Sequence, residues 1–164
     1  MFLWLKRKTS ISALRDGDER IVEGRVVPKR EIGVPGTQLK CVFYSQHVDK
    51  WDRGARGKGR KMWIPVNAEE KGEGFFLDDG TGRVWVAADD PRIDVTGGAE
   101  EAGPLGKKGK HRFFARLIRG GDVIRVRGVA SAPRAAEPGD VLVLRAGGKK
   151  DRLEILFRRR APKA

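Results

Sequence analysis

Apolar residues occur along the chain in short runs of β-branched and aromatic side chains, each bounded by Gly, Pro or Asp. Such runs are typical of β-strands. The pattern predicts strands near residues 20–28, 39–49, 61–66, 74–78, 82–88, 122–130, 140–145 and 153–157. Many short strands at this spacing favour a barrel or a sandwich.

Helical patterns are scarce. Residues 11–14 could form a single turn. Residues 111–119 (HRFFARLIR) would place their four large apolar side chains on one face of a helix, and this is the one amphipathic helix that the sequence predicts.

The stretch DDGTG at residues 78–82 has three chemical interpretations: a cation site, a phosphate loop or a turn. A calcium loop needs further oxygen ligands, but none follows Gly82 until Asp89. A phosphate loop of the Walker type needs a lysine and a following helix, and both are missing. Apolar runs flank the stretch on both sides, so residues 75–86 are predicted to form a β-hairpin.

Glycines at strand bends narrow the choice of fold. Gly24 lies in the middle of the first predicted strand, and Gly128 ends a strand that follows the turn at Gly121 and Asp122. With the hairpin and the predicted helix, this arrangement resembles an OB-fold, a five-stranded Greek-key barrel with a helix between its third and fourth strands. We therefore expect a mainly β protein, an OB-fold-like barrel with one short helix and long basic, glycine-rich loops.

The length of 164 residues suits one domain. Three stretches contain too few apolar residues to offset the entropy of ordering, namely 52–60, 96–110 and the basic tail 158–164. The expected organisation is an apolar and basic stub at 1–14, a barrel domain at 15–157 with a flexible loop at 96–110, and the tail.

The net charge of +13 and the pI near 10.4 indicate an anionic partner: nucleic acid, a membrane surface or an acidic protein. A merely solubilising surface is the alternative. The candidate contacts are Lys50, Trp51, Arg53, Arg56, Lys58, Arg60 and Lys61 in one loop, Lys107, Lys108 and Lys110 in another, and Arg125 and Arg127 on one strand face. Together these residues are predicted to line a positive groove.

The N-terminal stub offers a candidate membrane contact. Its residues are Phe2, Leu3, Trp4, Lys6, Arg7 and Lys8. The apolar part is too short for a bilayer span or a signal peptide, so it is either an interfacial anchor or an ordinary start that packs on the domain. We expect a cytoplasmic protein, with peripheral membrane attachment as an option.

Catalytic and metal-binding patterns are absent from the sequence. The single cysteine, Cys41, allows neither a disulfide nor a zinc cluster. His47 lies six residues further on the same predicted strand, about 20 Å away, so it cannot activate the thiol. Cys41, Trp63 and Trp85 are expected in the core, and Trp51 at the surface. We expect no enzymatic activity and no cofactor.

Several of these motifs together resemble a known family. Residues 34–44 (VPGTQLKCVFY), with Pro35, Cys41 and Tyr44, resemble the characteristic segment of the GIDE domain, also called the BAM ("beside a membrane") domain. Its other hallmarks match Gly24, the hairpin with Asp79 and Gly82, and the closing run with Gly121, Asp122 and Gly128. The resemblance covers about residues 15–157.

The resemblance implies an OB-like fold and a non-enzymatic module for binding or assembly, either between proteins or close to a membrane. The family includes MULAN-type mitochondrial E3 ubiquitin ligases and prokaryotic relatives. Ligase activity is not implied, because one cysteine cannot build a RING and the flanking transmembrane helices are missing. The expected partner is another protein or an anionic membrane surface, with no small-molecule substrate. The alternative function is an OB-type binder of single-stranded nucleic acid that uses the basic loops and an exposed aromatic residue.

Overall fold

The computed structural model describes residues 7–53, 59–90, 92–106, 108–147 and 151–161. Within these ranges the chain is almost entirely strand, and its helical element is a single 3-10 turn, η2 (Ile11–Ala13). The strands are β1 (Glu19–Pro28), β2 (Ile32–Gly33), β3 (Lys40–Cys41), β4 (Phe43–Asp52), β5 (Met62–Gly72), β6 (Phe75–Asp78), β7 (Arg83–Val86), β8 (Ile93–Thr96), β9 (Ala99–Leu105), β10 (His111–Ile118), β11 (Val123–Ser131), β12 (Val143–Arg145) and β13 (Leu153–Arg159).

Five strands close into a barrel. The wall runs β1, β6, β7, β12 and β11, and β11 pairs with β1 to complete the ring. The contact between β7 and β12 is parallel, and the other contacts of the ring are antiparallel. In chain order, the third barrel strand therefore neighbours the fifth and the fourth returns to the first, as in an OB-like Greek-key barrel. The predicted fold class is confirmed.

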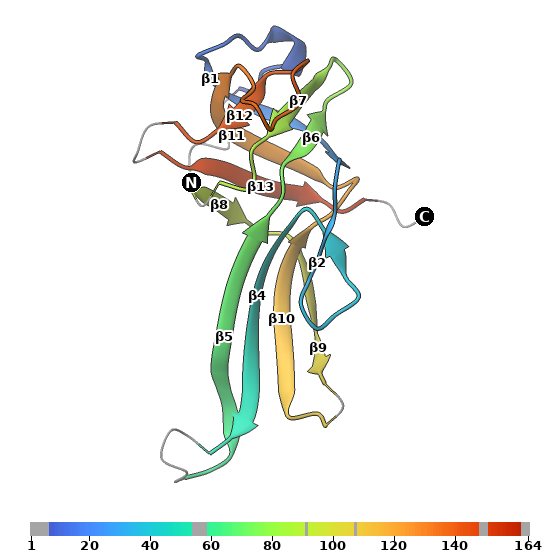
Figure 1. Ribbon diagram of the computed structural model, residues 1–164, viewed down its shortest axis with the longest axis vertical. Coiled ribbons are helices and arrows are strands. Elements are labelled where there is room, and N and C mark those ends of the chain that lie inside the picture. The colour runs from blue at the N-terminus through green and yellow to red at the C-terminus, as the bar shows by residue number, and fades with distance from the viewer. Residues whose placement is uncertain (1–6, 54–58, 91, 107, 148–150, 162–164) are drawn as a thin grey trace.

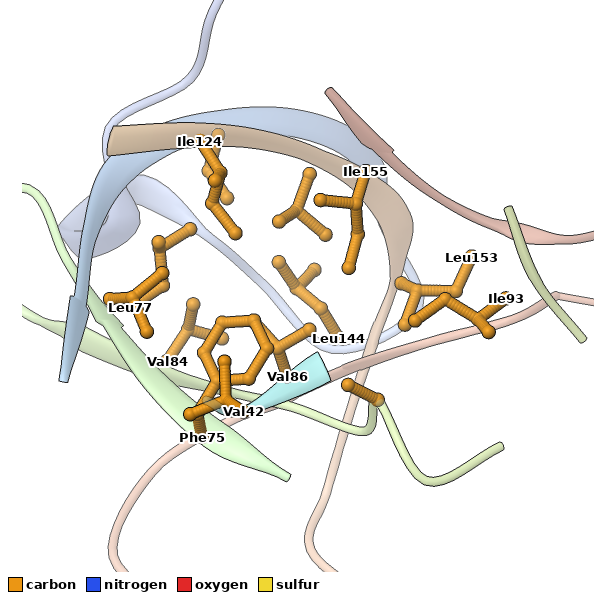
Figure 2. Close-up of a cluster of buried hydrophobic side chains, with 14 of the residues drawn as sticks. Val42, Phe75, Leu77, Val84, Val86, Ile93, Ile124, Leu144, Leu153 and Ile155 are labelled. Carbon is orange, nitrogen blue, oxygen red and sulfur yellow. The ribbon is translucent and has the colours of Figure 1, made fainter. Parts of the chain in front are cut away.

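The barrel interior is filled by alternate side chains of its strands. Figure 2 shows Phe75, Leu77, Val84, Ile124 and Leu144 converging on this core, and all five are completely buried. Turn η2 covers part of the same cluster. Because period-2 alternation directs every second side chain inward, these short strands bury a continuous core without a helix.

Two long connections leave the barrel and pair with each other. Residues 29–74 join β1 to β6 and contain β4 and β5, whereas residues 87–122 join β7 to β11 and contain β9 and β10. Strand β10 pairs with β4 along its full length, which gives a sheet in the order β5-β4-β10-β9. This sheet, here called the blade, projects away from the barrel (Figure 1).

The predicted helix at 111–119 is wrong, because this segment is the central strand β10 of the blade. Helical periodicity groups Phe113 with Phe114. In the strand, Phe113, Ala115 and Leu117 point to the buried side, while Phe114 points to the other face. Hydrogen-bonded neighbours on both edges determine this outcome, and local periodicity could not reveal them.

The predicted flexible loop at 96–110 is also corrected, since it contains the edge strand β9. It is held by backbone pairing with β10, and its two ends, Ala99 and Leu105, pack on the apolar cluster of the blade. Strand β5 likewise extends well beyond the predicted 61–66 through the polar residues 67–72. The predicted basic tail begins inside β13, which includes Arg158 and Arg159.

The stretch DDGTG forms the predicted hairpin turn between β6 and β7. The Asp79 carboxylate accepts hydrogen bonds from the N–H and the hydroxyl of Thr81, at 2.8 and 2.6 Å. It also accepts one at 2.8 Å from the N–H of Ile11, whose side chain is buried in the barrel core. Gly80 takes a positive φ of 86°, which favours glycine. The turn therefore anchors the segment that covers the end of the barrel.

Three other residues of the family resemblance, Gly24, Asp122 and Pro35, lie close to neighbouring segments. A Cβ on Gly24 would lie 2.6 Å from the carbonyl oxygen of Asp78 on the neighbouring strand. Asp122 is buried, and its carboxylate accepts hydrogen bonds of 2.8 Å from the N–H groups of Arg119 and Ala161. The carbonyl of Pro35 accepts a hydrogen bond of 3.1 Å from the Gln46 side chain on the blade.

Candidate ligand-binding face

One face of the blade is covered by the chain segment 32–41. Val34 and Cys41 of this segment pack with Tyr44 of β4 and with Phe113 and Leu117 of β10. Burial raises the pKa of the Cys41 thiol to about 11. The sulfur is thus a core atom, as the sequence predicts, and is poorly suited to nucleophilic chemistry.

Among the described residues, no segment packs across the opposite face of the blade, here called the open face. The pairing of β4 with β10 and β5 sets His47 opposite Phe114, Asp49 opposite Arg112, and Trp51 opposite Trp63. His47 and Trp51 are exposed, with 41 % of Trp51 accessible to solvent.

Five side chains of the open face form a continuous row, here called the stripe: Trp51, Trp63, Arg112, Phe114 and His47. The two tryptophan rings are 5.4 Å apart between centroids. The Arg112 guanidinium lies 4.3 Å from the Trp63 ring centroid and 5.0 Å from that of Phe114. The rings of Phe114 and His47 stack at 4.9 Å with an interplanar angle of 18°. The row thus places one cation, Arg112, between two pairs of rings.

The Arg112 side chain is held in place by a second contact. Its Nε donates to the buried Asp49 carboxylate at 3.0 Å. The guanidinium therefore stays between two rings instead of extending into solvent, a geometry that the planar arginine side chain accommodates and a lysine would not.

The free end of the blade, here called the tip, gathers the two predicted basic loops. The N–H of Trp51 donates to the carbonyl of Lys110 at 2.8 Å, which joins the end of the β4–β5 hairpin to that of β9–β10. The tip cations in the described ranges are Lys50, Arg53, Arg60, Lys61, Lys108, Lys110 and Arg112, against the carboxylates of Asp49 and Asp52. The remaining predicted loop contacts, Arg56, Lys58 and Lys107, lie outside the described residues.

Arg125 and Arg127 are not part of this surface, which corrects the predicted common groove. Both lie on β11 in the barrel wall, away from the tip (Figure 1). Arg125 is only 14 % exposed and donates to Glu23 at 2.8 Å. Arg127 donates to Glu19 at 2.8 Å and lies 3.6 Å from Glu154. Their charge is balanced by carboxylates of the neighbouring strands.

Glu23 is the centre of this barrel network and also pairs with Lys8 and Arg158, at 3.0 and 3.5 Å. Partial burial would raise the pKa of Glu23, but the hydrogen bonds from Arg125 and Lys8 outweigh it and lower the pKa. Of the predicted membrane stub, Phe2, Leu3, Trp4 and Lys6 lie outside the described residues.

The sequence interpretation missed four members of the stripe. Trp63 is only partly buried on the open face, so its predicted place in the barrel core is wrong, whereas Trp85 is buried as expected. Arg112 and Phe114 were hidden by the helical interpretation of 111–119. An alternating interpretation of that segment would have placed both side chains on one strand face, but it would not have identified β4 as the neighbouring strand.

No group of three or more His, Cys, Asp or Glu side chains suited to a metal ion occurs in the described ranges. Nor does any helix described there have the length and apolar character needed to cross a bilayer.

No protein-family model, curated protein or solved structure matches the chain.

Proposed function

We propose that this protein is a non-enzymatic binding module in which the barrel is the scaffold and the tip of the blade docks on an anionic partner. The observation that supports it is the hydrogen bond between Trp51 and Lys110, which joins two separate insertions into one basic, tryptophan-bearing end. Salt screens charges least at short distances, so cations on a projecting tip attract most strongly an anionic partner that is in direct contact with it.

The resemblance to the GIDE/BAM domain favours assembly next to a membrane or on an acidic protein, and single-stranded nucleic acid is the alternative anionic partner that the basic loops and Trp51 would fit. The contrast between tip and barrel supports docking through the tip. On the barrel wall, Arg125 and Arg127 already have carboxylate partners, whereas no ion pair within the described ranges involves Lys61 or Lys110.

The test is the salt concentration at which the protein elutes from immobilised heparin, used as a generic polyanion. The tip variant carries Lys61→Glu and Lys110→Glu. The control carries Lys29→Glu and Lys40→Glu, which change the net charge equally at exposed positions outside the tip. We expect the tip variant to elute at clearly lower salt than the control. Equal shifts in the two variants would show that only the overall charge matters and would refute docking through the tip.

A further inference from the structure

We propose that the stripe is a stacking platform for the bases of single-stranded nucleic acid, with the tip cations contacting its phosphates. This inference rests on the proposed function and names the class of its anionic partner. It requires two properties in one place: planar surfaces that accept rings, and positive charge beside them.

The planar surfaces are present in the stripe. From His47 to Trp51 the row covers about 13 Å, at ~3.3 Å per residue of strand. Aromatic sheet faces of other folds stack two or three bases over a comparable span. The outer ring, Trp51, has no neighbour on its distal side within the stripe and 41 % of its surface is accessible, so a base can extend the row there.

The charge around the stripe fits a phosphate backbone. The tip cations surround Trp51 and Trp63, and the Asp49 carboxylate is neutralised by Arg112. Toward the barrel the open face changes character, because the row next to His47 and Phe114 carries two carboxylates, Glu70 and Glu100, and a single cation, Arg116. A polyanion is thereby favoured over the outer half of the blade and disfavoured near the barrel.

The geometry favours single strands over a membrane surface as the occupant. The stripe rings contact one another along the face of the sheet instead of projecting as separate anchors from its end. Besides Trp51, the exposed large apolar side chains in the described ranges are Met62 and Val66, at 55 % and 52 %. Met62 is paired with Asp52 and lies on the face opposite to the stripe. A duplex is disfavoured because its bases are already stacked within it.

The experiment measures the affinity of the full chain for a fluorescent oligothymidylate of about 12 nucleotides, within the range of site sizes known for OB folds. An abasic oligonucleotide of equal length keeps the phosphates and removes the rings. We expect the oligothymidylate to bind more tightly than the abasic strand and to quench tryptophan fluorescence. The affinity for both should fall with salt, at a slope near −0.7 per neutralised phosphate.

Three variants locate the effect. Trp51→Ala should weaken oligothymidylate binding about tenfold or more, the usual loss for one base-stacking aromatic residue, and leave the abasic strand nearly unaffected. Arg112→Lys keeps the charge and removes the planar surface, so it should act in the same direction. Met62→Ala removes a comparably exposed apolar side chain from the opposite face and should change neither affinity.

The outcomes separate this inference from the proposed function. Equal binding of both strands, with no effect of Trp51→Ala but a loss in the Lys61→Glu/Lys110→Glu variant, would overturn the stacking platform and leave tip docking in place. Binding only to vesicles of phosphatidylcholine and phosphatidylserine would do the same and identify a membrane partner. If neither strand, nor heparin, nor these vesicles bind, both proposals fail.

Discussion

The hydrogen bonds of Asp79 predict that this turn residue stabilises the whole barrel. Its carboxylate accepts from the backbone N–H groups of Ile11 and Thr81, each at 2.8 Å. A hydrogen bond to a charged group contributes about 1.5–3 kcal/mol when buried, and partial exposure of Asp79 reduces this to about 1 kcal/mol each. We therefore expect Asp79→Ala to lower the free energy of unfolding by about 2 kcal/mol, or more if turn η2 detaches and exposes Ile11 and Leu14.

Asp78 provides a matched control one residue earlier. Its carboxylate accepts from Gly80 N–H at 2.8 Å and from Arg83 at 3.0 Å, within the turn and at its surface. Because these contacts anchor no other segment, Asp78→Ala should lower the free energy of unfolding by less than about 1 kcal/mol. Urea unfolding followed by tryptophan fluorescence gives both values, with the slope of the transition unchanged. Equal losses in the two variants would refute the role of Asp79 as an anchor.

The same contact makes a pH-dependent contribution to stability. Burial would raise the pKa of the Asp79 carboxyl, but the hydrogen bonds from Thr81 and from the N–H of Ile11 outweigh it and lower the pKa. The stabilisation is thus complete above the unfolded-state pKa of about 3.9 and is lost as the pH falls through the lower folded-state value. The difference between wild type and Asp79→Ala should be constant near neutral pH and shrink below about pH 4. A difference that persists in strong acid would contradict this.

Three further predictions concern buried residues. Gly24→Ala should destabilise by about 1–3 kcal/mol in urea unfolding, because its Cβ would meet the neighbouring strand, whereas Gly33→Ala, in a more open position, should change stability by less than ~0.5 kcal/mol. Cys41 is fully buried, so a thiol reagent at mildly alkaline pH should label it only as fast as the protein unfolds, and fast native-state labelling would contradict its core position. Arg145→Ala should lower the free energy of unfolding by about 3 kcal/mol, because it leaves the largely buried Glu137 carboxylate without its ion-pair partner. The two groups lie 2.7 Å apart in the native protein. A loss below ~1 kcal/mol would show that solvent reaches the pair.

The barrel could be predicted from the sequence because its determinants are local. Turn chemistry at residues 78–82 and β-branched runs at period 2 each indicate a strand or a turn without knowledge of the partner strand. Gly24 marks a close approach of the kind that occurs where a barrel strand bends. These signals agree with one another, so the closed barrel followed from them.

The blade could not be predicted in the same way, because its strands depend on partners far along the chain. Strand β9 has almost no apolar pattern and is stabilised by pairing with β10. The residues of β10 fit a helix and a strand equally well until β4 is beside them. The candidate site was hard to predict for the same reason. The basic loops and Trp51 could be identified in the sequence, but Arg112, Phe114 and His47 lie near Trp51 only because of the register between the strands.

The pairing of the two insertions has a consequence for the order of folding. Arg112 and Phe114 arrive on β10, and only a short turn separates β10 from β11, the strand that closes the barrel against β1. Contacts between such distant segments form late, because closing a long loop costs entropy before the contact compensates it. A nascent chain that ends before this region has neither a closed barrel nor a complete stripe. The stripe thus forms only after β10 has been made and has paired with β4, so we expect a shorter nascent chain to lack the proposed binding face.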